Sequence, residues 1–216
     1  MQALPRLALL VGSSRHGGNG AGLAEWLSSL LERRLNTLRK AVEIVVVDPT
    51  KPPHPVGPVV DGSKVPAQIP DSSSYSSLVI RHWSEFVSSC SAFAIITPEY
   101  NAGYPGELKN SLDHLYREWS GKPVMLVTYG GGGGLRCSAA LQTVLQGLKM
   151  HVVESPVGIT LPKQFTGGPE RVQPGHVYPE FLSPYEELIN KAADTLKDKI
   201  LVDVKSAEVK DVVRPN

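Results

Sequence analysis

The sequence predicts an α/β domain in which helices cover both faces of an open parallel sheet. Five short apolar runs, each bounded by turn residues, have the near-continuous hydrophobicity of strands that are buried on both sides. They alternate with segments whose apolar residues recur at helical spacing. This alternation is typical of a doubly wound sheet with right-handed crossovers. The predicted strands are Leu7–Val11, Val42–Val47, Phe93–Thr97, Val124–Tyr129 and Val152–Leu161.

Helices are predicted between these strands and after the last one. Their apolar positions run from Leu23 to Leu38, across Ser77–Ser89, through Leu108, Leu112, Leu115 and Trp119, from Leu141 to Leu148, and across Glu180–Leu201. We therefore assign residues 1–202 to a single domain and expect the charged segment 203–216 to form a loosely ordered tail. The connections 48–76 and 162–179 are too long for ordinary βα loops, and such loops are usually functional lids or disordered.

Composition argues against several classes of function. Lys and Arg number 22 against 21 Asp and Glu, so the net charge of +1 gives no reason to expect a nucleic-acid or membrane partner. The N-terminal apolar run is too short to span a bilayer. Cys90 and Cys137 form neither a disulfide framework nor a metal cluster, which favours a reducing, cytoplasmic location. His82 and Glu85 lack a third ligand, so no metal site is expected.

Ligands of doubly wound sheets bind at the carboxyl ends of the strands, where the strand order reverses. The turn after the first predicted strand, Gly12–Gly20, contains hydroxyls, Arg15 and the expected start of a helix near Asn19 or Gly20, which favours an anion. It matches neither a Walker A loop nor the dinucleotide fingerprint, so a monophosphate is expected. A tight turn with a surface arginine is the alternative interpretation.

Two further turns carry residues suited to a flat heterocycle. After the third strand, Tyr100, Asn101 and Tyr104 offer ring contacts and edge hydrogen bonds, although the tyrosines could instead fill the helix–sheet junction. After the fourth strand, the run Gly130–Gly134 favours close approach of the backbone to a ligand, with a flexible linker as the weaker alternative.

At these residues the sequence resembles the NADPH-dependent FMN reductase family, which includes quinone, azo and chromate reductases. The resemblance covers roughly residues 5 to 160 and implies a flavodoxin-like, five-stranded parallel sheet in the order 2-1-3-4-5. The matching motifs are Gly12-Ser13-x-Arg15, Pro98-Glu99-Tyr100-Asn101, Pro105-Gly106-x-Leu108-Lys109-Asn110-x-x-Asp113, and Gly130–Gly134 with Arg136.

The resemblance also implies a role for each motif. Ser13, Arg15 and the N–H groups near Asn19 would bind the phosphate of FMN. The isoalloxazine ring would be lined on one side by Pro98, Glu99, Tyr100 and Asn101, and on the other by Gly130, Gly131, Gly132 and Gly133. Where the family often has a Ser or Thr that adds a phosphate contact, this chain reads His16-Gly17-Gly18-Asn19-Gly20, so the contact shifts to the backbone and Asn19.

The function so implied is an NAD(P)H-dependent reductase that reduces bound FMN and passes electrons to a quinone, free flavin or similar small acceptor. The flavin performs the chemistry, and no side chain is expected to be an obligatory acid or base. A homodimer or tetramer is expected, with the helix of Lys109, Asn110 and Asp113 at the interface. The alternatives are an FMN-binding redox sensor that acts through a protein partner with little turnover, and a flavin-free binder of another phosphorylated ligand.

Overall fold

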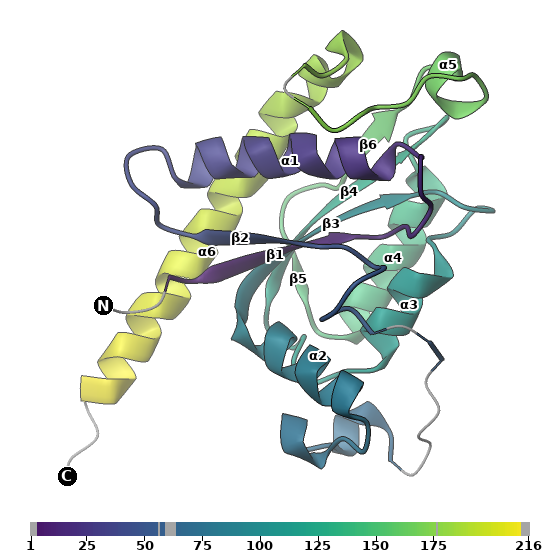
Figure 1. Ribbon diagram of the computed structural model, residues 1–216. Helices are drawn as coiled ribbons and strands as arrows, with labels where there is room; N and C mark the ends of the chain where they lie inside the picture. Colours follow the sequence, from purple (N-terminus) through teal and green to yellow (C-terminus); the bar gives the residue numbers. More distant parts are fainter. Residues whose placement is uncertain (1–3, 56, 59–63, 176, 213–216) are drawn as a thin grey trace.

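The computed structural model describes residues 4–55, 57–58, 64–175 and 177–212, with side chains described up to residue 202. Within these residues the strands form a six-stranded parallel sheet in the order β2-β1-β3-β4-β5, and β6 also pairs with β4 (Figure 1). The predicted flavodoxin-like strand order is confirmed. The strands are β1 Arg6–Val11, β2 Glu43–Val47, β3 Cys90–Pro98, β4 Pro123–Gly130, β5 His151–Val152 and β6 Val157–Thr160.

Helices cover both faces of the sheet, as predicted (Figure 1). One apolar core lies between the sheet and helices α1 and α6, and a second lies between the sheet and helices α2, α3 and α4. No helix in the described part of the chain is long and apolar enough to cross a membrane. The helices are α1 Gly20–Leu35, α2 Leu78–Ser89, α3 Gly106–Asp113, α4 Leu135–Gly147, α5 Lys163–Thr166 and α6 Glu186–Val212.

Strand register brings the turns after β1, β3 and β4 to one edge of the sheet. Val11 pairs with Ile96, and the Gly12 N–H donates to the Ile96 carbonyl at 2.8 Å. One strand further on, Pro98 pairs with Tyr129. Because parallel strands end at the same edge, the three turns that follow are neighbours in space.

The predicted fifth strand, Val152–Leu161, is two short strands. β5 ends at Val152 and β6 begins at Val157. Between them Glu154 has a φ of 55°, and Pro156 has no N–H to donate to β4. The edge of the sheet is therefore interrupted, and both pieces pair with β4.

Helix α1 ends at Leu35, before the predicted stripe does, and Leu38 is 98% exposed. Asn36 Oδ1 accepts hydrogen bonds from the N–H groups of Ala41, at 2.7 Å, and Val42, at 3.0 Å. This side chain therefore turns the backbone toward β2.

Helix α3 also ends early, at Asp113, although Leu115 and Trp119 are buried as predicted. The Trp119 indole donates to the Leu112 carbonyl at 3.2 Å, and the Tyr116 N–H turns to the Glu118 carboxylate at 3.3 Å. The Tyr116 N–H would bond to Leu112 if the helix continued, so these side-chain contacts replace its next turn.

The last helix begins and ends later than the predicted Glu180–Leu201. The first six residues of the predicted range, Glu180–Tyr185, form a separate 3₁₀ helix that contains Pro184. The α-helix α6 begins after this proline, at Glu186. The backbone stays helical to Val212. Residue 202, the predicted boundary of the domain, is thus not the end of the helix.

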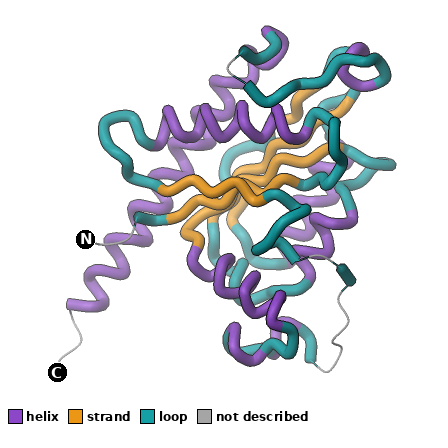
Figure 2. Tube along the Cα trace, viewed as in Figure 1, coloured by secondary structure: helices purple, strands orange, loops and turns teal. Residues whose placement is uncertain are grey.

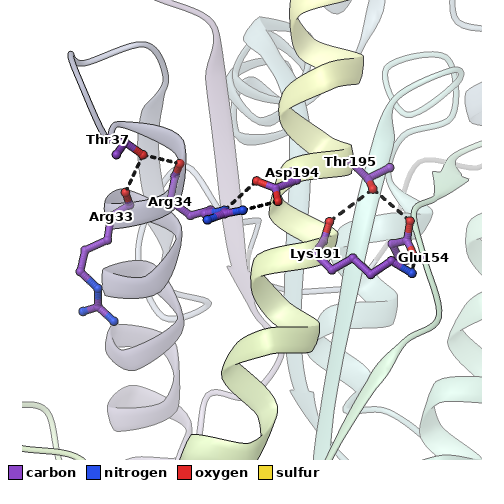
Figure 3. Close-up of polar contacts among 7 residues, drawn as sticks. All are labelled: Arg33, Arg34, Thr37, Glu154, Lys191, Asp194 and Thr195. Carbon is purple, nitrogen blue, oxygen red and sulfur yellow. Dashed lines mark hydrogen bonds and ion pairs between the residues drawn. The ribbon is translucent and has the colours of Figure 1, made fainter.

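Polar contacts attach α6 to α1 and to the turn between β5 and β6 (Figure 3). Arg34 donates from Nε and Nη2 to both carboxylate oxygens of Asp194. Glu154 accepts from the Thr195 hydroxyl at 3.0 Å and pairs with Lys191 at 2.8 Å. Most of these side chains remain accessible to water, so the pairs mainly fix the position of α6. Its stability comes from burial of Ile189, Leu196 and Ile200.

Much of the described part of the long connection 48–76 lies against the face that α2 covers (Figure 2), while Asp48–Thr50 border a cavity together with α1. The Tyr75 hydroxyl donates to Glu118 at 3.0 Å, and the buried His54 ring lies 5.6 Å from the Trp83 ring. These parts are therefore anchored to the domain at both ends. They contain two short 3₁₀ helices, Pro66–Gln68 and Ser72–Ser74.

Candidate functional site

A cleft of about 460 Å³ lies where the three turns meet. This volume falls within the roughly 300–1,000 Å³ of ordinary small-molecule sites. Eight of its lining residues are predicted site residues: Ser13, Arg15, Asn19, Pro98, Glu99, Tyr100, Gly130 and Gly131. The other lining residues are His16, Gly17, Gly18, Gly20, Tyr129, Leu161, Phe165, Thr166 and Arg171. The structure therefore brings most of the predicted site together.

One end of the cleft is suited to an anion. The first intrahelical bond of α1 runs from the Leu23 N–H to the Asn19 carbonyl, so the N–H groups of Gly20 and Ala21 have no partner within the helix. Arg15 adds a positive charge, and its guanidinium lies 4.0 Å from the centre of the Tyr100 ring. Ser13 Oγ and the Tyr100 hydroxyl are 2.7 Å apart. The anion end and the aromatic wall are thus directly connected.

Ser14 and Glu107 fix the shape of the β1–α1 turn. Glu107 Oε1, in the first turn of α3, accepts hydrogen bonds from the Ser14 N–H at 3.2 Å and from the Ser14 hydroxyl. Burial alone would raise the Glu107 pKa, but the hydrogen bonds to its carboxylate, led by the one from the Ser14 hydroxyl, act with the charge of Arg15 and together hold the pKa below its usual value. Both residues occupy variable positions of the motifs, which is why the motifs did not reveal them.

We expect Glu107→Gln to lower the free energy of unfolding by about 1 kcal/mol at pH 7, because it removes a charge-assisted hydrogen bond at a half-buried site. A carboxyl whose pKa is lowered by folding stabilises the protein above its unfolded pKa. The difference between wild type and variant should therefore hold at neutral pH and shrink as the pH falls through the lowered pKa. Urea unfolding at a series of pH values measures it.

Glu85→Gln is the matched control, because Glu85 is an exposed carboxylate of α2. It should change the free energy of unfolding by less than about 0.5 kcal/mol. A Glu107→Gln variant as stable as this control at pH 7 would contradict a role for Glu107 in holding the turn.

The Asn19 side chain lies at the cleft, but it holds another segment. Its Nδ2 donates to the Phe165 carbonyl at 2.8 Å, and its Oδ1 accepts from the Val172 N–H at 2.9 Å. The side-chain amide of Asn19 therefore attaches the segment after β6 to α1. What remains for an anion at this position is the backbone N–H groups at the start of α1.

Glu99 is likewise engaged. Its carboxylate accepts from the Arg136 side chain, at 2.7 and 3.0 Å, and from the backbone N–H of Arg136 at 3.1 Å. Burial alone would raise its pKa, but the hydrogen bonds from Arg136 and from the Cys137 N–H outweigh burial and keep the pKa low. Glu99 thus caps the start of α4 as an ionised group. Arg136 is thereby paired, as Lys109 is with Asp113 within α3.

The glycine run divides into two parts. Gly130 and Gly131 line the cleft, and a Cβ on Gly131 would have no atom within 4 Å. Gly133 and Gly134 have φ near +70°, and the Gly133 carbonyl accepts from the Thr128 hydroxyl at 2.8 Å. Of the predicted residues Gly132 and Gly133, neither lines the cleft. Gly133 and Gly134 therefore turn the chain into α4, whereas Gly130 and Gly131 form a part of the cleft wall that no side chain covers.

Asn101 is the remaining predicted residue outside the cleft lining. It lies at the exposed tip of a tight turn, in which Tyr100 and Gly103 exchange backbone hydrogen bonds of 2.8 and 2.9 Å. Asn101 and Ala102 both have positive φ, of 49° and 65°. The turn projects from the carboxyl edge and presents Tyr100 to the cleft, so the contribution of Asn101 here is to the backbone turn.

Comparison with known proteins identifies the family. The profile of the NADPH-dependent FMN reductases matches residues 5–161, which include all three turns. The chain belongs to this family. It is therefore an NAD(P)H-dependent flavin oxidoreductase with FMN as its cofactor.

The relatives are consistent with this assignment. An NAD(P)H-dependent FMN reductase of Saccharomyces cerevisiae is 37% identical over 164 residues, which are 73% of this chain and 85% of the relative. A quinone reductase of Escherichia coli is 37% identical over 90 residues, covering 39% of this chain and 44% of that protein. The structure of FerB, an NAD(P)H:(acceptor) oxidoreductase of Paracoccus denitrificans, matches with a TM-score of 0.61 at 20% identity, covering 91% and 97% of the two chains, and shows the shared fold.

The cleft fits FMN at both ends. A phosphate matches the free N–H groups at the start of α1 and the charge of Arg15. A flat ring matches the space between Tyr100 and the uncovered backbone at Gly131. Sequence reasoning missed the wall formed by Tyr129, Leu161, Phe165 and Arg171. The unusual length of the segment 162–179 was the one signal for part of it.

Proposed function

We propose that the chain holds FMN between the turn Ser13–Gly20, the loop Pro98–Tyr100 and the backbone of Gly130 and Gly131, and that NADPH or NADH reduces it for a quinone, free flavin or similar small acceptor. The cleft at the carboxyl ends of β1, β3 and β4 carries this proposal, because an anion site and a flat aromatic wall adjoin there.

The side chains of the cleft position the cofactor. Bound FMN supplies the hydride and electron-transfer chemistry. Arg15 and the start of α1 bind the phosphate, and Tyr100 presents its ring to the heterocycle while Ser13 holds its hydroxyl. Glu99, paired with Arg136, stays ionised and is not available as a proton donor. No protein atom lies within 4 Å of a Cβ placed on Gly131, so the edge of the isoalloxazine ring has room there.

An anaerobic titration of FMN-loaded protein with NADPH and with NADH tests the proposal. The flavin absorbance should bleach with one equivalent of dinucleotide, and a panel of quinones, flavins and azo dyes should restore it. One shared site for donor and acceptor predicts parallel double-reciprocal plots. Protein that takes up no FMN, or intersecting plots, would contradict the proposal, and slow reduction without turnover would favour the redox sensor.

We also propose that the protein is a homodimer or tetramer and that it acts in the cytoplasm. The α3 residues Lys109 and Asp113 form a half-exposed ion pair on the surface, and Cys90 and Cys137 are free and buried, which suits a reducing compartment. Light scattering of the FMN-loaded protein gives the oligomeric state, and a monomeric mass across the working concentration range would contradict it.

A further inference from the structure

The segment that follows β6 forms one wall of the cleft although it lies beyond the matched family region, which ends at residue 161. Phe165, Thr166 and Arg171 all line the same cleft as Arg15 and Gly17–Gly20. The anion end therefore lies between two pieces of chain that are about 150 positions apart in the sequence.

This segment is fastened to the start of α1. Asn19 bonds to it twice, through the Phe165 carbonyl and the Val172 N–H, and both Phe165 and Val172 are buried. The backbone of Val172 lies so close to Gly22 of α1 that a Cβ on Gly22 would be 2.1 Å from the Val172 carbonyl oxygen. The backbone from 165 to 172 is therefore held against the helix start where the phosphate is proposed to bind.

Arg171 brings a positive charge to this place. Its Nη1 donates to the carbonyls of Gly168, at 2.7 Å, and Glu170, at 2.6 Å, so the guanidinium is supported by its own loop. Among the described residues, no carboxylate forms an ion pair with it. An arginine that is held in place, faces a cleft and lacks a counter-ion is suited to a phosphate, to which it can donate from two nitrogens.

The β1–α1 turn leaves a place for such a group. Between Arg15 and Asn19 the chain has His16, Gly17 and Gly18, and none of these supplies a hydroxyl. A phosphate monoester carries a charge of about −1.5 to −2 at neutral pH, more than Arg15 alone neutralises. The cleft lining thus offers a second guanidinium where this part of the turn lacks a hydroxyl.

We propose that Arg171 binds the phosphate monoester of FMN together with Arg15 and the start of α1. This inference rests on the proposed function, because it assigns a residue to the same cofactor. It makes the segment 162–174, outside the family motifs, part of the cofactor site. It also gives Asn19 and Gly22 a role, which is to hold that segment where its guanidinium faces the anion end.

Comparison of FMN with riboflavin isolates the phosphate. Apoprotein of the wild type and of Arg171→Gln is titrated with each flavin, and quenching of flavin fluorescence gives the Kd. The amide of the variant can still donate to loop carbonyls but carries no charge. We expect FMN to bind about tenfold or more weakly to Arg171→Gln, and riboflavin to bind equally well to both proteins. Arg171→Lys should recover part of the loss, and added salt should reduce the difference.

Lys163→Met is the matched control, because it removes an exposed positive charge from the same segment without touching the cleft lining. It should leave both affinities within about twofold. Equal weakening of FMN and riboflavin by Arg171→Gln, an unchanged FMN affinity, or an effect on the KM for NADPH alone would each overturn the inference. Failure of the proposed function itself would be visible separately, as wild-type protein that binds no FMN.

Discussion

Replacing Gly131 by valine is expected to weaken FMN binding by about 100-fold while leaving the fold intact. The Cβ would point into the cleft, where no protein atom lies within 4 Å, and the added methyl groups would occupy the space of the ring edge. Overpacking of about 3 kcal/mol would weaken FMN binding by about 100-fold. The Kd from fluorescence quenching and the free energy of unfolding of the apoprotein, measured together, check both parts of the expectation.

Gly132→Val serves as the control for this experiment. Gly132 is equally exposed, its added Cβ is equally free of contacts, and it does not line the cleft. FMN should bind to this variant within about threefold of wild type, since surface substitutions away from a site have small effects. If the two variants bound FMN alike, the cofactor would not lie against Gly131.

Replacing Gly12 by alanine is expected to lower the free energy of unfolding by about 3 kcal/mol, at the upper end of the overpacking range. The new Cβ would lie 2.3 Å from Thr97 Oγ1 and 2.5 Å from Thr97 Cβ. Thr97 is fully buried on β3, which pairs with β1 on one side and β4 on the other, so it has little room to move. Denaturant unfolding of the apoprotein measures the loss.

Gly147→Ala is the corresponding control at the end of α4, where an added Cβ meets no atom within 4 Å. Alanine should be neutral or stabilise the protein by up to about 1 kcal/mol, because it restricts the unfolded chain. A Gly12→Ala variant that unfolds at the same denaturant concentration as this control would show that β1 and β3 can separate freely at the edge of the cleft.

The sequence predicts the arrangement of the sheet well because the central strands β1, β3 and β4 are largely apolar and are buried on both faces. The central strands β1, β3 and β4 are found within a few residues of their predicted bounds. The misplaced boundaries depend on single groups that hydrophobic periodicity does not register, such as the Asn36 amide that ends α1. Likewise, the turn Glu154-Ser155-Pro156 divides the fifth strand, although Val152 and Val153 before it and Val157 after it are apolar.

The sequence predicts only part of the site, and the residues that it does not predict share one physical reason. Motifs at the ends of strands converge because parallel topology places them together, which accounts for Ser13, Pro98 and Gly130. The positions of Glu107 and Arg171 depend on contacts made between segments distant in sequence, to Ser14 in one case and through Asn19 in the other. No local pattern encodes such contacts, and only the excess length of the segment 162–179 hinted at one.

The late portion of α6 lies at the edge of the sheet opposite the cleft. Thr195, Asp198 and Val202 border a shallow pocket together with Pro123 and His151, the first residues of β4 and β5. The first residue of β1 lies at this same edge (Figure 1). A tether attached near the late portion of α6 or near the start of β1 would orient the molecule with its cleft pointing away from the tether. The protein could thus be fixed to an electrode or fused to a second enzyme while dissolved mediators still reach the flavin.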